Sequence, residues 1–395
     1  MFTYVDQEKS AKIKVIGVGG AGGNAINNMI ASNLQGVKFI AGNTDAQALE
    51  ISRAPVKIQM GEKLTHGLGA GANPQIGRDA ALESEEALRN ALSDSHMVFI
   101  TAGFGGGTGT GAAPVIAEIC KDLGALTVAV VTKPFAFEGK KRTKLAESGI
   151  ENLKKVVDTA ITIPNDRMRG LAPKNAKLME MFLRADEILL HSVKGITDLI
   201  MMPGLVNLDF ADVKTTMSKA GMAIMGIGIA SGESRAVEAA ERAMSHPLLE
   251  DIPIAGATGV LMNITSTSDM EFEEVAEASE RIHDEVGDDA DIFWGTSIDD
   301  SLGDEMRVTV IATGIGAEEE AQKADNAVEL PLRGKVRDIT PADLEREIVD
   351  YEEPTFIRQQ KAVGESSGAV YRGHHGLPAE DGELDVPTFL RRKAD

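Results

Sequence analysis

The sequence predicts an α/β protein. A Rossmann-like domain with a parallel sheet is joined by a central helix to a smaller α+β domain, and a disordered linker and a short C-terminal tail motif follow. Wholly apolar runs at residues 97–100 and 126–132 are typical of strands buried on both faces of a parallel sheet. A glycine-rich loop at residues 103–111 follows the first run and precedes a helical pattern. A long helical pattern at residues 177–201 then separates this region from one of different texture.

Composition limits the classes of function. The chain has 395 residues, which is more than one compact domain usually holds. Its 40 Lys and Arg and 61 Asp and Glu give a net charge of −21, which argues against general nucleic-acid binding because such binding needs a basic surface. The single cysteine, Cys120, is predicted to pack in the core. No apolar run of about 18 residues and no basic-then-apolar N-terminus occurs, so we expect a cytoplasmic protein without direct membrane insertion.

A glycine pattern marks the first strand-to-helix junction. Residues 1–11 are polar, and we expect them to be disordered. Residues 12–18 read as a strand, and a helix follows. Gly17, Gly19 and Gly22 match the dinucleotide-binding pattern G-x-G-x-x-G in this context, which predicts a phosphate group at the helix N-terminus.

Two further segments bear on the same site. A second predicted strand, residues 37–41, comes shortly before Asp45. An acid about 20 residues beyond the glycine pattern holds ribose in a dehydrogenase, but Asp45 is equally suited to cap the next helix, and both interpretations stay open. Residues 67–74 form another glycine-rich loop, followed by an acidic helix at residues 76–92. Several such loops near strand or helix ends predict one nucleotide site more readily than separate turns.

The loop at residues 103–111 is the strongest signal. Six of its nine residues are glycine, with Thr108 and Thr110 between them. An ordinary turn uses one or two glycines, because each costs backbone entropy on folding. We therefore expect a polyphosphate to lie against this main chain, with N–H groups, the threonine hydroxyls and the positive end of the next helix as donors. That helix is predicted to begin at Ala112, with Pro114 in its first turn.

Charged and polar residues follow the next two strands. Glu138 is suited to accept ribose hydroxyls and Arg142 to bind phosphate through its guanidinium fork. As a solvated charge cluster at the start of a helix they need no such role, and on the pair alone that interpretation is favoured. A strand at residues 160–164 ends at Asn165.

The long helix carries a candidate pair for binding a base. Phe182 and Asp186 are four residues apart and therefore share one face. Phe182 is suited to stack on a base and Asp186 to accept its N–H groups; the alternative is a core phenylalanine beside an exposed aspartate. No cluster of His, Cys and Asp with zinc-ligand spacing occurs in the sequence.

A second acidic pair follows a Pro-Gly break at residues 203–204. Asp209 and Asp212 are three apart at the start of a helix. Taken alone, this spacing favours N-capping and compensation of the helix dipole. The G-K-[ST] ending of a P-loop is absent, so no Walker lysine is available to the phosphate site.

The remainder of the chain divides into three parts. Residues 223–316 have the texture of an α+β domain. Its strands are expected at residues 223–230, 259–264 and 306–313, and its helices at residues 235–245 and 272–286. Residues 317–383 lose the apolar periodicity and gain Gly, Pro and charge, which predicts a disordered linker. Residues 384–395 regain apolar and basic character, which favours a partner-binding tail.

With these motifs in place, the chain resembles the FtsZ family, the bacterial tubulin-like GTPases of cell division, over about residues 12–316 and again in the tail. Its most specific marks are Gly-Gly-Gly-Thr-Gly-Thr-Gly at residues 105–111, the tubulin-type phosphate loop, and Asn-Leu-Asp-Phe-Ala-Asp at residues 207–212. The resemblance implies a tubulin-like GTP-binding domain at residues 12–176, a central helix at 177–202, a catalytic loop and following helix at 203–222, and the C-terminal α+β domain at 223–316.

The resemblance also implies roles for individual residues. The nucleotide-binding set is Gly20, Ala21, Gly22, Gly23, Asn24, Gly107, Thr108, Gly109, Glu138, Arg142, Asn165, Phe182 and Asp186. In this set the glycine loops bind phosphates, Glu138 holds ribose, Arg142 approaches phosphate, and Phe182 and Asp186 engage guanine with Asn165 nearby. The catalytic set is Asp209 and Asp212, with Asn207, acting on the GTP of the neighbouring subunit.

The implied function is GTP hydrolysis by subunits that polymerise head-to-tail into cytoskeletal filaments. These filaments would form the division ring at mid-cell, where the septum forms. The cofactors would be GTP or GDP with Mg²⁺ held through the phosphates, and no metal site of the protein's own. Besides other copies of the chain, the expected partners are an FtsA-like membrane tether and other division proteins, bound by the tail from Leu384 to Arg392.

Two alternatives from other classes remain. An NAD-dependent dehydrogenase agrees with the first glycine pattern and Asp45, but it leaves the other glycine-rich loops unexplained. A scaffold that binds nucleotide without hydrolysing it agrees with the loops, but it would not need both Asp209 and Asp212.

Overall fold

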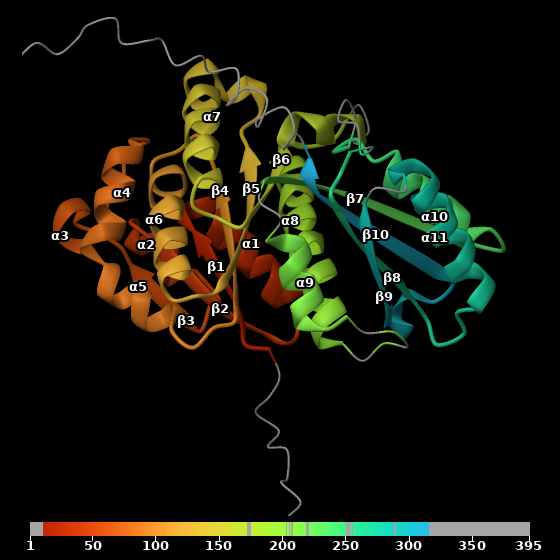
Figure 1. Ribbon diagram of the computed structural model, residues 1–395. Helices are drawn as coiled ribbons and strands as arrows, with labels where there is room; N and C mark the ends of the chain where they lie inside the picture. Colours follow the sequence, from red (N-terminus) through yellow and green to blue (C-terminus); the bar gives the residue numbers. More distant parts are fainter. Residues whose placement is uncertain are drawn as a thin grey trace, which may run out of the picture. The chain divides into compact units, whose positions relative to one another are not determined.

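One continuous sheet runs through the molecule. The structure, a computed structural model, describes residues 11–171, 175–202, 204, 206, 208–218, 221–249, 254, 256–287 and 290–315. Within these residues the strand order is β3-β2-β1-β4-β5-β6-β7-β10-β8-β9, with helices on both sides (Figure 1). The α/β fold class is therefore confirmed. The predicted linker at residues 317–383, the tail at residues 384–395 and residues 1–10 lie outside the described residues.

The first half of the sheet is parallel throughout. Its strands are β1 (Ile13–Val18), β2 (Val37–Asn43), β3 (Val56–Gln59), β4 (Met97–Gly103), β5 (Leu126–Lys133) and β6 (Thr159–Pro164). The central strands β1 and β4 are almost wholly buried, as expected of strands covered on both faces. Because the strands are parallel, their carboxyl ends meet along one edge, where the connecting loops gather.

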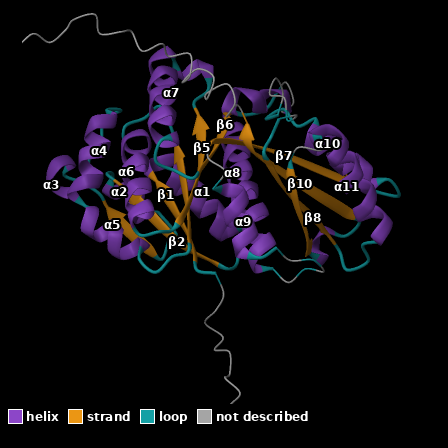
Figure 2. Ribbon diagram, viewed as in Figure 1, coloured by secondary structure: helices purple, strands orange, loops and turns teal. Residues whose placement is uncertain are grey.

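Helices cover both faces of this half (Figure 2). They are α1 (Gly19–Ala31), α2 (Ala46–Glu50), α3 (Glu62–Thr65), α4 (Pro74–Glu83), α5 (Glu85–Leu92), α6 (Thr108–Asp122), α7 (Lys140–Lys154) and α8 (Leu178–Met201), with 3-10 turns η2 (Ala136–Glu138) and η3 (Asn165–Leu171). Successive β4 side chains point to opposite faces. Phe99 belongs to the apolar cluster that also contains residues of α1 and α8, and Ile100 to the cluster that contains residues of α4 to α7.

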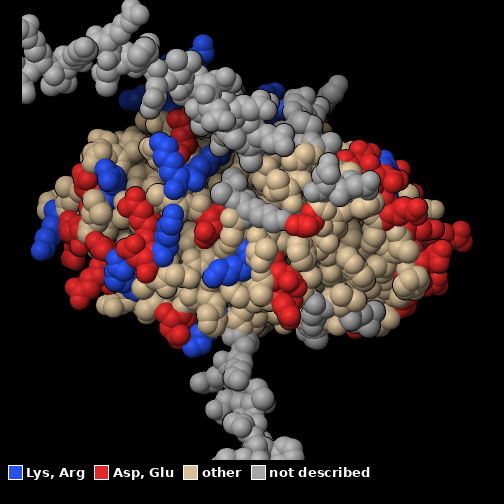
Figure 3. All heavy atoms as spheres, in the orientation of Figure 1, with Lys and Arg blue, Asp and Glu red and all other residues tan. Residues whose placement is uncertain are grey.

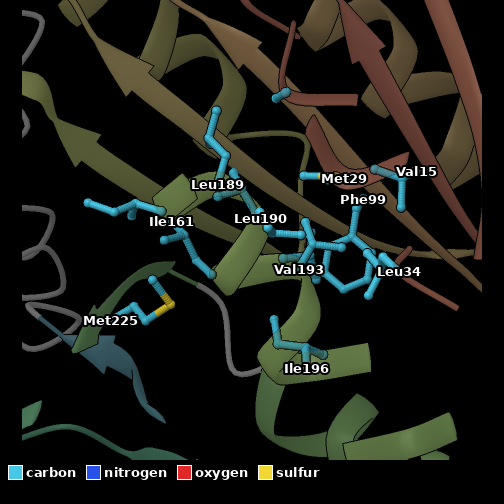
Figure 4. Close-up of a cluster of buried hydrophobic side chains, with 14 of the residues drawn as sticks. Val15, Met29, Leu34, Phe99, Ile161, Leu189, Leu190, Val193, Ile196 and Met225 are labelled. Atoms are coloured by element: carbon cyan, nitrogen blue, oxygen red, sulfur yellow. The ribbon is translucent and has the colours of Figure 1, made fainter. Parts of the chain in front are cut away.

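The central helix α8 is held by one apolar face. Leu189, Leu190, Val193 and Ile196 recur at helical spacing and are buried. Figure 4 shows these side chains beside Phe99 and other labelled residues of the first half, so α8 is part of the same core. Burying four such side chains contributes roughly 1.5–3 kcal/mol each, which fixes the helix against the sheet.

The second half of the sheet is mostly antiparallel and joins the first directly. Its elements are α9 (Phe210–Met217), β7 (Gly221–Ser231), α10 (Arg235–Met244), β8 (Gly259–Ser266), α11 (Phe272–Val286), β9 (Asp291–Ile298), η4 (Asp300–Leu302) and β10 (Glu305–Ile315). β7 continues the parallel half by pairing with β6 and is followed by β10 in antiparallel register. Arg235 on α10, only 6% exposed, forms a 2.6 Å ion pair with Glu274 on α11, which locks the two covering helices together.

Acidic side chains gather over α10 and α11 (Figure 3). These two helices carry Glu238, Glu241, Glu273, Glu274, Glu277, Glu280, Asp284 and Glu285. A surface of this sign repels phosphate backbones, which agrees with the expectation that the protein is no general nucleic-acid binder.

Several boundaries differ from those expected. The helix expected at residues 76–92 is two helices broken at Ser84, whose hydroxyl accepts the N–H of Gly61. Helix α6 begins at Thr108 rather than Ala112, so Pro114 lies inside the helix and not in its first turn. The strands β3 and β9, at the two edges of the sheet, were not expected at all.

The expectation for the single cysteine is met. Cys120 is buried, and burial raises the pKa of its thiol to about 12, so the thiol stays protonated and unreactive. Among the described residues, no helix combines the length and the apolarity needed to cross a bilayer.

Candidate functional site

A cavity of about 430 Å³ lies at the carboxyl edge of the parallel strands. Its walls come from the loops after β1, β4, β5 and β6 and from the first turns of α8. The predicted residues in its lining are Gly20, Ala21, Asn24, Gly107, Thr108, Gly109, Glu138, Arg142, Asn165, Phe182 and Asp186. Segments up to about 160 residues apart in the sequence therefore meet around one space, as the loop positions predicted.

Two helix N-termini meet at this cavity without caps. Helix α1 begins at Gly19 directly after β1, and α6 begins at Thr108, within the glycine-rich segment at residues 103–111. Neither has a side-chain cap, and neither has an acid in its first turn. The free N–H groups and the partial positive charge of both helix ends therefore remain available to an anion such as phosphate.

The two helix ends are in backbone contact, and this requires glycine at position 19. Gly19 has a φ of 73°, a conformation that side chains disfavour. A Cβ at Gly19 would lie 3.1 Å from the N of Gly109 and 3.3 Å from the Cβ of Thr108. A side chain here would force the neighbouring backbone of α6 to shift by a few tenths of an ångström, in addition to the strain of the positive φ.

Two different causes explain why glycine occurs in the loop at residues 103–111. A Cβ at Gly106 would have no neighbour within 4 Å, so this residue is open to the cavity as expected. A Cβ at Gly107 would lie 2.8 Å from the Cβ of Ala70, in the loop at residues 67–74, and one at Gly111 would collide with the carbonyl of Pro74. A ligand therefore does not explain every glycine by itself: Gly107 also packs on the loop at residues 67–74, and Gly111 packs on α4.

The two threonines of the loop differ in the same way. Thr110 is buried, and its hydroxyl accepts the N–H of Gly105 at 2.9 Å, so it fixes the loop internally. Thr108 lines the cavity, and its hydroxyl oxygen lies 2.7 Å from the hydroxyl oxygen of Thr44. Of the two threonines expected to face a ligand, only Thr108 lines the cavity.

Glu138 and Arg142 form an ion pair on the cavity wall. Their closest atoms are 2.6 Å apart, and the second carboxylate oxygen of Glu138 accepts the N–H of Phe135 at 2.9 Å. The Glu138 side chain is 15% exposed, whereas that of Arg142 is half-exposed. A solvated charge cluster does not describe this arrangement, because the carboxylate is fixed by two donors and is turned towards the cavity.

Aromatic side chains gather at one end of the cavity. Phe182 on α8 meets Phe135 edge-on, with ring centroids 5.5 Å apart, and Phe135 stacks on Phe137 at 5.2 Å. Phe182 is 40% exposed, so it is not the core residue of the alternative interpretation. Its uncovered ring surface is available to a flat ligand.

Two polar groups at the same end lack a partner among the described residues. Burial, and to a smaller extent the neighbouring Glu187 carboxylate, raises the pKa of Asp186 to about 7. Asn165 is 5% exposed, and its side-chain oxygen has no hydrogen-bond partner among the described residues. A buried acceptor without a donor costs about 1–3 kcal/mol, so both groups suit a ligand that brings N–H donors.

Gly22 and Gly23 are the predicted residues that do not line this cavity. Gly22 faces inward, where a Cβ would collide with the carbonyl of Thr101, and Gly23 lines a separate cavity of about 80 Å³ between α1 and α2. Asp45, beside this smaller cavity, caps α2 by accepting the N–H groups of Gln47 at 2.9 Å and Ala48 at 3.3 Å. Its role as a cap is therefore confirmed, and a space this small does not hold the adenosine of a dinucleotide.

Asp209 and Asp212 lie at the opposite end of α8 from the cavity (Figure 1). Asp209 is the N-cap residue of α9, but its side chain makes no capping hydrogen bond. Asp212 is in the first turn, and neither carboxylate has a hydrogen bond or an ion pair with any described residue. At 1.5 Å per residue the helix between the two sites is about 36 Å long, so these acids do not reach the cavity of their own chain. Asn207 lies outside the described residues.

Two features of the cavity escaped the sequence analysis. The contact of Thr44 with the cavity residue Thr108 was not expected. Its position directly after a parallel strand was nevertheless a usable signal that it lies near the site. Phe135 was not expected to support Phe182. Within the part of the chain that the structure describes, no group of three His, Cys, Asp or Glu side chains forms a metal site.

Comparison with known proteins agrees with this geometry. The family model described as "Tubulin/FtsZ family, GTPase domain" matches residues 12–173, and "FtsZ family, C-terminal domain" matches residues 221–316. The chain is 48% identical to the cell division protein FtsZ of Azotobacter vinelandii and 48% identical to that of Pseudomonas aeruginosa, in each case over 100% of both chains. Among solved structures, an FtsZ dimer of M. jannaschii is 48% identical with a TM-score of 0.76, over 79% of this chain and 90% of that one.

Proposed function

Because the chain belongs to the FtsZ family of tubulin-like GTPases, we propose that it binds GTP in the 430 Å³ cavity and hydrolyses it only after head-to-tail assembly with copies of itself. The observation that carries the proposal is the separation of two incomplete sites. Anion donors converge at one end of α8, and two carboxylates without described partners stand at the other. Each is complete only when the far end of a second copy meets it.

The cavity fits a guanine nucleotide in three parts. Phosphates lie at the N-termini of α1 and α6, and Glu138 accepts the ribose hydroxyls. The guanine base stacks against Phe182 and donates its N–H groups to Asp186 and to the unpaired oxygen of Asn165. A volume of about 430 Å³ lies within the usual range for ligand pockets, about 300–1,000 Å³.

Magnesium would be held by the nucleotide and not by a protein site. Glu138 and Asp186 are the acids of the cavity lining, and they stand at the ribose and base ends. Mg²⁺ prefers oxygen ligands and keeps several waters, so phosphate oxygens and water suffice. Bound there, it would neutralise charge on the β- and γ-phosphates.

Exposed apolar side chains support a head-to-tail contact. Close in the sequence to the cavity residues Glu138 and Phe182, the exposed apolar residues are Phe137, Leu178, Met179 and Leu183. At the opposite end, Val206 and Trp294 are also partly exposed, and the backbone N–H of Thr296 on β9 holds Val206 through its carbonyl at 3.0 Å. A contact between two different surfaces does not close, and it therefore builds filaments.

The acids of one copy then serve the GTP of the next. Asp209 and Asp212 accept the hydrogens of a water molecule and orient its oxygen for in-line attack on the γ-phosphorus. As the new P–O bond forms, the bond to the β–γ bridging oxygen breaks, and the N–H groups of α1 and α6 stabilise the charge that develops on GDP. Neither half of the site performs this step alone.

The cellular role follows from the relatives. The curated relatives are named cell division proteins, and we extend that role to this chain as a filament of the division ring at mid-cell. The tail at residues 384–392, outside the described residues, would bind an FtsA-like membrane tether and other division proteins.

A turnover series against protein concentration tests the proposal. GTP hydrolysis per molecule should rise steeply with concentration, together with light scattering from assembly, because a single copy holds only half a site. Hydrolysis per molecule that stays constant down to concentrations at which sedimentation finds only monomers would contradict it. Binding of NAD rather than GTP, seen as a rise in the melting temperature, would favour the dehydrogenase alternative.

A further inference from the structure

Thr44 connects three segments around the cavity. It lies between β2 and α2 and is completely buried. Its hydroxyl oxygen is 2.7 Å from that of Thr108, the first residue of α6. Its carbonyl accepts the N–H of Gly69 at 3.2 Å and the hydroxyl of Thr65 at 3.2 Å. One residue therefore joins the start of α6 to the loop at residues 67–74.

The direction of the hydrogen bond between the two hydroxyls follows from counting protons. Each hydroxyl has one proton, and the hydroxyl of Thr44 has no other partner than Thr108 among the described residues. If Thr108 donated, the buried proton of Thr44 would have no acceptor, and such a group costs much more than an ordinary hydrogen bond gains. Thr44 is therefore the donor, and Thr108 is the acceptor.

This direction leaves the proton of Thr108 free on the cavity side. Thr108 lines the cavity at the uncapped N-terminus of α6, where the phosphates are expected. A hydroxyl that accepts one hydrogen bond becomes a stronger donor in the next, because the two bonds polarise each other. The acceptor here would be an ionised phosphate oxygen, which forms the stronger, charge-assisted type of hydrogen bond.

We propose that Thr44 is a positioning residue for the nucleotide phosphates: it directs the hydroxyl proton of Thr108 towards a phosphate oxygen. The proposal rests on the proposed function, because it needs phosphate at the start of α6. Thr44 itself does not line the cavity and acts through Thr108.

Three variants separate this role from ordinary core packing. Thr44→Val keeps the shape and removes the hydroxyl, whereas Thr44→Ser keeps the hydroxyl. Thr65→Val is the matched control, because it removes another buried hydroxyl that contacts Thr44 but donates to its carbonyl and not to Thr108. The melting temperatures of the nucleotide-free proteins report whether each variant folds, and Thr44→Ala serves as a second variant without the hydroxyl.

The readout is the affinity for GDP compared with that for guanosine, measured by competition with a fluorescent guanine nucleotide. Thr44→Val should bind GDP about tenfold more weakly, because the Thr108 hydroxyl keeps its proton but loses the hydrogen bond that orients it and strengthens its donation to phosphate. Its affinity for guanosine, which lacks phosphate, should stay within about twofold of the wild-type value on the same argument. Thr44→Ser and Thr65→Val should bind GDP nearly as the wild-type protein does.

A double-mutant cycle tests the path through Thr108. In a Thr108→Val background, Thr44→Val should have no further effect on GDP affinity, because the hydroxyl it orients is gone. Additive losses, equal losses for GDP and guanosine, or an unchanged GDP affinity in Thr44→Val would each overturn the inference. A wild-type protein that binds no guanine nucleotide would instead overturn the proposed function, and this inference with it.

Discussion

The two ends of α8 differ in how firmly their side chains are held, although Asp186 and the side-chain oxygen of Asn165 at the cavity end also lack partners among the described residues. At the cavity end, hydrogen bonds fix the side chains of Glu138, Thr108 and Thr110. The start of α1 also packs closely against the start of α6 at Gly19. At the acid end, the backbone is held by β9, but the carboxylates contact no described residue. A rigid binding site at one end and two unpaired acids at the other are what a site shared between two copies requires.

The largest effect is expected from removing an acid. Asp212→Asn keeps the shape of the side chain and removes its charge, so GTP turnover should fall about a hundredfold or more, as for other groups that act on the transition state. GTP affinity should stay within about twofold, because the cavity is at the other end of the chain. Steady-state turnover and equilibrium binding measure the two quantities.

An exposed acid elsewhere in the chain provides the control for Asp212→Asn. Asp284→Asn removes an exposed carboxylate from α11, away from the acid end, and it should leave turnover unchanged. If Asp212→Asn also hydrolyses GTP at the wild-type rate while it binds nucleotide and assembles, the acid end has no catalytic role.

A pair of adjacent glycines tests the rigidity of the cavity end. Gly19→Ala places a side chain at a φ of 73° and against Gly109, so the free energy of unfolding should fall by about 1–3 kcal/mol. A Cβ at Gly20 meets nothing within 4 Å, so Gly20→Ala should unfold within about 0.5 kcal/mol of the wild-type protein. Urea denaturation monitors both. Equal destabilisation of the two variants would show that the backbone contact at position 19 is unimportant.

The smallest expected effect is on the pH dependence of nucleotide binding. The pKa of Asp186 is raised to about 7 in the free protein, and guanine N–H groups need its ionised form as acceptor. Binding is therefore coupled to loss of a proton, and GDP affinity should be about tenfold weaker at pH 6 than at pH 8. Asp186→Asn should bind weakly and keep only the pH dependence that comes from titration of the phosphates, which corrects the wild-type profile for that effect. A wild-type profile no steeper than that of Asp186→Asn would exclude Asp186 as the acceptor.

Much of the fold and of the cavity wall could be predicted because the signals are local. Apolar runs such as residues 97–100 report burial on two faces, and glycine loops at strand ends report where the sheet edge lies. Phe182 and Asp186 were predicted together because helical spacing alone puts them on one face.

The remaining features depend on contacts between distant segments. Gly107 and Gly111 are glycines because α4 and the loop before it pack on them, which no local pattern reveals. The hydroxyls of Thr44 and Thr108 are in contact because the sheet places β2 and β4 on either side of β1, and this strand order cannot be read from a local pattern. Edge strands such as β3 were missed because a four-residue, half-exposed strand has almost no hydrophobic pattern.

The shared site can be tested most directly by mixing two inactive variants. Asp212→Asn retains the cavity and lacks an acid. Gly106→Asp retains the acids and places a carboxylate in the cavity, where a new side chain meets no neighbour and would repel phosphate.

Neither variant alone should hydrolyse GTP. In the mixture, the acids of Gly106→Asp copies meet GTP bound by Asp212→Asn copies, and turnover should return. A mixture that stays at the summed background of its two components, while sedimentation shows that they assemble together, would contradict the account.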